Sequence, residues 1–122
     1  MEKPHRRLEV WKRGVDLVTQ VYRWTDGFPE RERYGLANQM RRAAVSIPSN
    51  IAEGAAHNSR KNFTHFLHMA QASLSELDTQ LEISHRLSYL DNSVLSKLDA
   101  AMLEVDKMLS GLIRSLRAGK RM

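Results

Sequence analysis

The stretch "LSKLDAAMLEVDKMLSGLIRSL", residues 95–116, repeats apolar side chains at alternating intervals of three and four. The apolar positions are Leu95, Leu98, Met102, Val105, Leu109, Leu112 and Leu116. This spacing places one apolar stripe along one face of an α-helix, and it is typical of a helix that packs in a bundle. We therefore predict a helix over about 92–118, with Asp91 or Asn92 as its N-cap.

Three further segments carry apolar side chains at helical spacing and predict three more helices. The predicted ranges are about 8–25, 30–54 and 59–88. Pro29 suits the start of the second range, and Ser59 suits the N-cap of the third. No segment alternates with a period of two for long enough to predict a strand. Because the connections are short, we expect residues 1–122 to form a single all-α domain, an up-down-up-down antiparallel four-helix bundle.

The first predicted helix has more apolar surface than one bundle core needs. Its two apolar rows are Trp11, Val15, Val18 and Tyr22, and Val10, Leu17, Val21 and Trp24. The core-facing stripe of a bundle helix is about 100° wide, so this wider face favours a second buried surface between copies of the chain. The alternative is a helix whose apolar edges are covered within its own bundle.

Residues 39–54, "QMRRAAVSIPSNIAEG", combine the spacing of a buried helix with a proline. Pro48 lacks an N–H group and its ring crowds the carbonyl of Ala44, which costs about 3 kcal/mol inside a helix. The stretch predicts either one long helix bent near Pro48 or two shorter helices that separate at 46–49.

The same stretch carries a polar row on one side of the predicted helix. The candidate members of a structural polar network are Arg42, Ser46, Asn50 and Glu53, with Ser73 and Glu76 of the third helix as possible partners. Such a network could set helix register and subunit geometry. The alternative is an ordinary solvated face.

The composition limits the class of protein. The chain has 122 residues, a formal charge of +5, a pI near 9.9 and no cysteine, which excludes disulfides and thiol chemistry. No apolar run approaches the length of a membrane span or a signal-peptide core, so we expect a cytoplasmic protein with no membrane partner. The basic balance favours an anionic partner.

The predicted topology gathers the positive charge at one end of the bundle. Residues 1–13, 53–61 and 107–122 share this end and hold twelve bases and three carboxylates, a balance of +9, against seven bases and eleven carboxylates, a balance of −4, elsewhere. The candidate nucleic-acid-binding residues are Lys3, Arg6, Arg7, Lys12, Arg13, Arg60, Lys61, Arg114, Arg117, Lys120 and Arg121. Such an end should attract the phosphate backbone of RNA or DNA without reading base sequence. The alternatives are that these bases only aid solubility and that the protein is an interaction scaffold with no nucleic-acid role.

Metal and catalytic sites are not predicted. Glu82 and His85 form an E-x-x-H motif, but the second E-x-x-H motif of a di-iron bundle is absent. His65 and His68 share a helix face without an evident third ligand. Nucleophile elbows and glycine-rich phosphate loops are also absent, so we predict no catalytic residue, no cofactor and no enzymatic activity.

Two stretches together resemble a known bacterial family. They are "FPERERYGLANQMRRAAVSIPSNIAEG", residues 28–54, and "FLHMAQASLSELDTQLEISHRLSYL", residues 66–90. The matching positions are Phe28, Pro29, Gln39, Arg42, Ser46, Ile47, the run from Asn50 to Gly54, Ser73, Glu76 and Leu77. On these residues the chain resembles the four helix bundle protein family, also called the 23S rRNA intervening-sequence protein family.

The resemblance implies an up-down bundle that assembles as a homopentameric ring and has no established enzymatic activity. A related branch is the accessory variability protein of diversity-generating retroelements, a basic pentamer that binds nucleic acid and works with a reverse transcriptase. The resemblance therefore implies RNA or DNA, other copies of the chain, and a reverse transcriptase or other protein as partners. The quoted residues do not distinguish the two branches.

Overall fold

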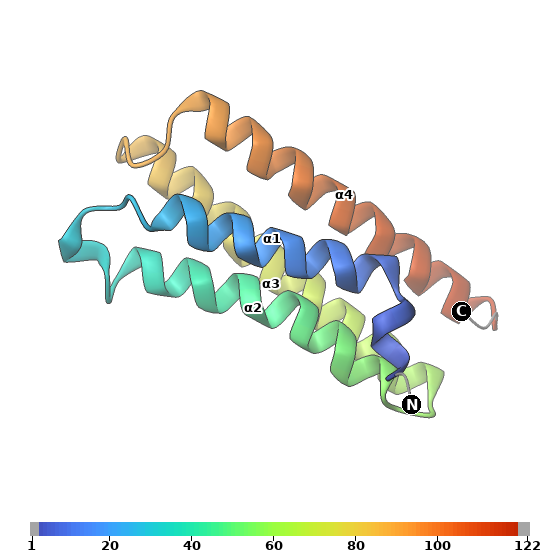
Figure 1. Cartoon of the computed structure of the whole chain (residues 1–122). Helices are drawn as coiled ribbons and strands as arrows, with labels where there is room; N and C mark the ends of the chain where they lie inside the picture. The colour runs from blue at the N-terminus through green and yellow to red at the C-terminus, as the bar shows by residue number, and fades with distance from the viewer. Residues whose placement is uncertain (1–2, 120–122) are drawn as a thin grey trace.

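The computed structural model describes residues 3–119 of the chain as an all-α bundle (Figure 1). In this range the chain forms four α-helices, two short 3-10 helices and no strand. The elements are η1 (Pro4–Arg7), α1 (Glu9–Thr25), η2 (Glu30–Glu32), α2 (Leu36–Ala55), α3 (Arg60–Arg86) and α4 (Asn92–Arg117). Each helix runs antiparallel to the next and packs against two neighbours, in the order α1, α2, α3, α4 and back to α1. The all-α prediction is confirmed.

The core lies where the apolar stripes of the four helices meet. Its fully buried side chains include Leu17, Met40, Ile47, Ile51, Leu67, Leu77, Leu81, Leu98 and Leu109. In α4, Val94 and Ile113 lie in the core, whereas Leu95 and Leu112 are only half-buried. The predicted stripe kept a period of 3.5 residues, but a helix of 3.6 residues per turn drifts by about 20° per heptad. The core stripe therefore moves to neighbouring positions at both ends of α4.

The predicted start of the second helix, at residue 30, is wrong. Residues 30–32 form the separate 3-10 helix η2, and α2 begins at Leu36. The Glu32 carboxylate accepts a hydrogen bond from the backbone N–H of Leu36 at 3.1 Å. This acceptor satisfies one of the free N–H groups at the start of α2, so the chain turns here instead of continuing as one helix.

Pro48 lies inside α2, which continues through it, so the alternative of two shorter helices is wrong. The proline packs against α1 at Gly14, where an added Cβ would lie 3.4 Å from the Pro48 Cβ. Near the proline, the Ser46 hydroxyl donates to the carbonyl of Ala43 at 2.7 Å, and the Asn50 amide donates to the carbonyl of Ser46 at 2.8 Å. These local bonds occupy carbonyl groups around the missing N–H group.

The additional apolar row of α1 lies along its edge with α2. Trp11, Val15 and Val18 are half-buried there, and Tyr22 is 45% exposed. Tyr22 also lies under the guanidinium of Arg41 on α2, which is 4.6 Å from the ring centroid. None of the described helices has the length and hydropathy required to span a membrane.

Candidate nucleic-acid interface

Three segments far apart in sequence meet at one end of the bundle. In Figure 1 the start of η1 and the end of α4 lie there, beside the connection between α2 and α3. An even number of antiparallel helices returns the chain to the end where it began. We call the residues 3–13, 53–61 and 107–119 the basic end. Lys120 and Arg121, two predicted binding residues, lie outside the described residues.

A close approach of two helices shapes the basic end. A Cβ added at Gly54 would lie 2.8 Å from the Cβ of Phe66 and 3.0 Å from the ring of Phe63. Because glycine has no side chain, the backbone at the end of α2 can lie directly against the Phe63 and Phe66 side chains of α3. This contact places the first residues of α3 at the tip of the bundle.

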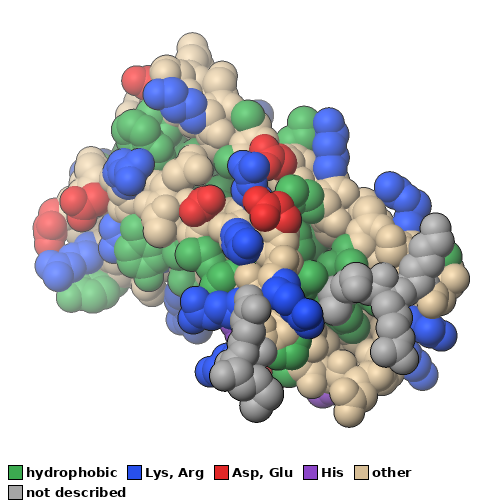
Figure 2. All heavy atoms as spheres, turned by 45° about the vertical axis from the view of Figure 1, so that its right-hand side comes forward, with side chains coloured by type: hydrophobic (Ala, Val, Ile, Leu, Met, Phe, Trp, Pro, Cys, Tyr) green, Lys and Arg blue, Asp and Glu red, His purple; other side chains and the backbone are tan. Residues whose placement is uncertain are grey.

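The described candidate bases are all exposed. Figure 2 turns this end toward the viewer and shows Lys and Arg side chains gathered on it. The exposed candidates are Lys3, Arg6, Arg7, Lys12, Arg13, Arg60, Lys61, Arg114 and Arg117. The structure thus brings together the predicted residues that it describes.

Not all of these bases are equally available to a ligand. Arg13 forms ion pairs with Glu104 of α4 at 2.9 Å and with Glu9 at 3.5 Å, and Lys12 lies 4.0 Å from Glu9. The guanidinium of Arg6 lies 5.2 Å from the centroid of the Trp11 ring. Arg13 and Lys12 are therefore weaker candidates than the sequence suggested, because carboxylates already neutralise part of their charge.

A hollow of about 1130 Å³ opens at the basic end between η1 and the start of α3. Its lining residues are Pro4, Arg7, Leu8, His57, Asn58, Ser59, Arg60, Lys61, Phe63 and Leu116. The lining includes two arginines, a lysine and a histidine but no carboxylate. No described carboxylate lies within ion-pairing distance of Arg7, Arg60 or Lys61. An anion in this hollow would meet positive charge from two elements.

The backbone at the start of α3 adds to this positive potential. The Ser59 hydroxyl accepts a hydrogen bond from the N–H of Asn62 at 3.2 Å and caps the helix. The positive end of the dipole of this 27-residue helix therefore lies beside Arg60 and Lys61. Arg60 also donates to the carbonyl of Gly119 at 3.3 Å, which ties the start of α3 to the end of α4. Gly119 adopts a φ of +78°, a conformation that suits glycine after a helix.

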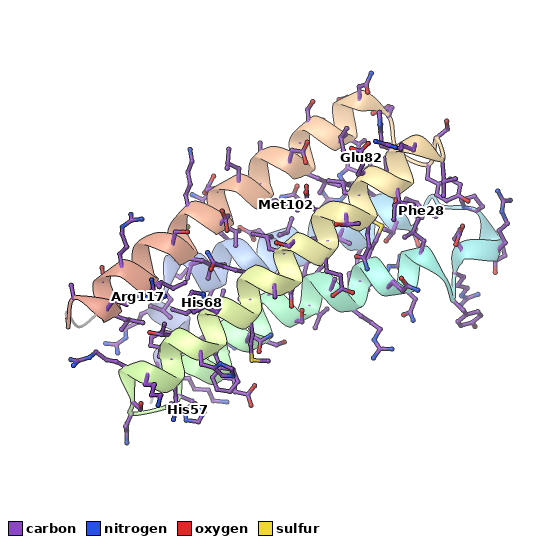
Figure 3. All side chains as sticks on the ribbon, turned by 180° about the vertical axis from the view of Figure 1, so that it is seen from behind. Phe28, His57, His68, Glu82, Met102 and Arg117 are labelled. Atoms are coloured by element: carbon purple, nitrogen blue, oxygen red, sulfur yellow. The ribbon has the colours of Figure 1, made fainter. Side chains whose placement is uncertain are left out.

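A second part of the basic end lies between α3 and α4. Arg117 donates a hydrogen bond to the Nε2 atom of His68 at 3.1 Å, and the two side chains face each other in Figure 3. Because a guanidinium can only donate, Nε2 of His68 must be the acceptor. Arg114 is exposed on the same helix, three residues before Arg117.

The opposite end of the molecule has a different character. There the Glu32 carboxylate accepts hydrogen bonds from the hydroxyl of Tyr89 at 2.8 Å and from the N–H of Leu36. These two bonds, that from Leu36 first, lower the pKa of Glu32 below its ordinary value. Phe28 packs its ring against Tyr89 with centroids 5.1 Å apart.

The predicted polar network does not join α2 to α3 within the described chain. Ser46 and Asn50 bond to carbonyls of α2 itself, and Glu76 accepts a hydrogen bond at 3.4 Å from Gln80 of its own helix. Arg42 and Glu53 are exposed. Ser46, Asn50 and Ser73 are half-buried and Glu76 is exposed. A role of this set between subunits stays a prediction.

Arg41, which the sequence analysis did not select, bonds across helices instead. It donates to the hydroxyl of Thr25 at 2.9 Å and to the carbonyl of Tyr22 at 3.3 Å, and it lies 3.8 Å from the Asp26 carboxylate. Successive helical residues point about 100° apart, so Arg41 faces α1 whereas Arg42 faces solvent. Gln71 was also missed; its amide joins α3 to Asp106 and Ser110 of α4.

A protein-family model described as "23S rRNA-intervening sequence protein" matches residues 6–111. The chain belongs to this family. No curated protein matches it. Among solved structures it is similar to a protein of unknown function from the S23 ribosomal protein family of Bacteroides thetaiotaomicron VPI-5482. The TM-score is 0.79 and the identity 22%, over 86% of this chain and 95% of that one, which shows a shared fold.

In this family member, the histidines considered as metal ligands have other neighbours. His85 hydrogen-bonds through Nε2 to the Asn92 side chain at 2.7 Å, and Glu82 accepts from Arg86 at 2.8 Å. The ring of His65 lies edge-on to Phe66. Among residues 3–119 no group of three or more His, Asp or Glu side chains is arranged to hold a metal ion.

Proposed function

We propose that the protein is a non-enzymatic, oligomeric bundle that binds the sugar–phosphate backbone of RNA or DNA through its basic end. The observation that carries this proposal is the hollow lined by Arg7, His57, Arg60 and Lys61 without a carboxylate. Cations of this kind bind phosphates and release counterions, which gives affinity without sequence specificity.

The resemblance extends the proposal to a homopentameric ring that acts as an accessory to an RNA- or DNA-processing enzyme, such as a reverse transcriptase. A ring repeats the basic end in each copy, and several weak phosphate sites on one nucleic acid bind more tightly than one site. The half-exposed apolar row of α1 supports self-association.

A protein-interaction scaffold is the second candidate function. It is favoured by exposed apolar side chains on α3 and α4, where Leu103 is 54% and Ile83 is 43% exposed. In that case the basic end would only aid solubility, and a protein partner would be recovered after nuclease treatment.

Titration of one labelled oligonucleotide, as RNA and as DNA, over a salt series tests the proposal. The double variant Arg7→Gln/Lys61→Gln should weaken binding roughly tenfold at low salt and reduce the salt slope by about one to two. The control is Arg31→Gln/Arg33→Gln at the opposite end of the bundle, which removes the same formal charge from exposed side chains.

The control pair should leave the affinity near that of the unchanged chain. Equal losses from both pairs would show that only net charge matters and that the hollow is not the site. An absence of binding at low salt would overturn the proposal altogether.

A further inference from the structure

Two aromatic rings stack beside the hollow at the basic end. The ring of His57, in the connection after α2, lies nearly parallel to the ring of Phe66 on α3, with an angle of 18° between the planes and 5.2 Å between the centroids. Figure 3 shows His57 at this end of the bundle, beside the connection between α2 and α3. His57 also lines the hollow, so one ring of the stacked pair belongs to the candidate phosphate site.

The outer face of the His57 ring is open to solvent. One face lies against Phe66, yet the His57 side chain as a whole is exposed. Phe66 itself is half-buried, and its Cβ lies close to the backbone of α2 at Gly54. A ring that is backed by a second, packed ring and open on its other face offers a flat surface on which a further ring can stack.

Other aromatic side chains of the basic end do not offer such a surface. The half-buried ring of Trp11 already has the Arg6 guanidinium 5.2 Å and the His5 ring 4.8 Å from its centroid. Phe63 lines the hollow but is only 4% exposed. The open face at this end therefore belongs to His57.

The cations of the hollow lie next to this open face. Arg7, Arg60 and Lys61 line the same hollow as His57. Proteins that bind single-stranded nucleic acid combine cations that hold the backbone with aromatic rings on which bases stack. In a duplex each base is already paired and stacked on its neighbours, so a base could reach His57 only by leaving the stack, which costs free energy.

We propose that the basic end binds single-stranded RNA or DNA in preference to duplexes, because an unpaired base stacks on the open face of His57 while a phosphate of the same strand lies in the hollow. Every base has a π-face, so this contact selects a single strand without selecting its sequence. The inference rests on the proposed function, which supplies the contact to the backbone.

Three ligands of equal length separate the base from the backbone in a binding titration followed by fluorescence anisotropy. They are a single strand of mixed sequence, an abasic strand that keeps the phosphates, and a duplex of the mixed sequence. The unchanged chain should bind the mixed single strand more tightly than the other two. His57→Ala should weaken binding of that strand by about fivefold or more, and should leave binding of the abasic strand and the duplex unchanged.

Two further substitutions separate stacking from charge. His57→Phe keeps a flat ring without an ionisable group, and His57→Lys supplies a positive charge without a ring. Stacking predicts that the Phe variant keeps the preference for the mixed single strand and that the Lys variant loses it, whereas a purely electrostatic contact predicts the reverse.

The matched control is His65→Ala. His65 is also exposed and also contacts Phe66, but its ring lies edge-on, at 67° to the Phe66 plane, and it does not line the hollow. This variant should bind all three ligands as the unchanged chain does. Because both histidines are exposed, the variants should fold, which circular dichroism can verify.

The outcomes distinguish this inference from the proposed function. Equal affinity of the unchanged chain for the mixed and abasic strands would overturn the inference and leave the proposed function in place. So would a His57→Ala variant that loses no affinity for the mixed strand, equal losses from His57→Ala and His65→Ala, or a preference kept by the Lys variant and lost by the Phe variant. An unchanged chain that binds none of the three ligands would overturn the proposed function and this inference with it.

Discussion

The two ends of this bundle differ in how their polar groups are satisfied. At the end opposite the basic end, the Glu32 carboxylate takes hydrogen bonds from Tyr89 and Leu36, and Arg41 bonds to Thr25 and Tyr22. At the basic end, the exposed bases of the hollow have no described carboxylate within ion-pairing distance.

Because of this difference, the groups that stabilise the fold and the groups available to bind a ligand lie at different ends of the bundle. Bonds made within the chain fix the turns and close the fold at one end, and exposed cations contribute little to folding. The cations of the basic end instead keep their charge available for a ligand. Substitutions at the two ends should therefore move different measured quantities.

The largest effect is expected at Gly54, where one substitution should lower both the stability of the fold and the affinity for nucleic acid. Gly54→Ala would place a Cβ 2.8 Å from the Cβ of Phe66 and force α2 and α3 apart. We expect a loss of about 1–3 kcal/mol in the free energy of unfolding, measured in urea, together with weaker nucleic-acid binding. The control is Gly111→Ala in α4, where the nearest side-chain atom is 3.9 Å away. Gly111→Ala should instead stabilise the fold by up to about 1 kcal/mol, because alanine favours a helix more than glycine does. A Gly54→Ala variant as stable as the unchanged chain would refute the close contact between α2 and α3.

A smaller effect on stability alone is expected at the opposite end. Tyr89→Phe removes the hydroxyl that donates to Glu32 and keeps the ring that packs against Phe28. The urea midpoint should fall, and the affinity for nucleic acid should not change. A loss of binding in this variant would contradict the separation of the two ends.

The same substitution should alter the response to acid. The pKa of Glu32 is lower in the folded chain than its ordinary value, so its stabilising contribution is present above about pH 4.3 and is lost as the pH falls through the folded pKa. Tyr89→Phe removes one of the two bonds that lower this pKa. Stability of the variant should therefore decline less steeply in acid than that of the unchanged chain, in urea titrations repeated across this pH range.

The smallest effect on stability is expected from Ser59→Asp. This substitution should raise the stability of the fold and lower the affinity for nucleic acid. A carboxylate at this N-cap favours the helix dipole and should stabilise by about 0.3–1 kcal/mol at most. It also places a negative charge in the hollow, so binding to RNA or DNA should weaken. The matched change is Asp91→Ser at the N-cap of α4, which accepts from Val94 at 2.9 Å and should leave binding unchanged. Tighter binding by Ser59→Asp would move the site away from the hollow.

Sequence predicted the parts of this fold that depend on local spacing. The apolar stripes of α3 and α4 are local patterns, and Ser59 and Asp91 cap the helices as expected. The start of α2 was missed because it depends on Glu32, whose carboxylate also bonds to Tyr89, 57 residues away. Sequence spacing carries no information on such a distant contact.

The candidate site, too, could be predicted from the sequence only in part. Helix direction alone brings residues 3–13, 53–61 and 107–119 to one end of the bundle, as the topology predicted. The pairing of Arg13 with Glu104 depends on how α1 and α4 are rotated about their axes, as does the choice between Arg41 and Arg42. The hollow depends on η1, a short element with no apolar periodicity to reveal it.

The return of the chain to its starting end has a practical consequence. Pro4 lines the hollow and Gly119 is bonded to Arg60 of its lining, so a polyhistidine or acidic tag joined on either side can reach the hollow and should be removed before binding is tested. Under the proposed function, a protein fused on either side of residues 4–119 would be carried close to the bound nucleic acid. The bundle could then deliver a fused enzyme to a bound strand without any change to its own surface.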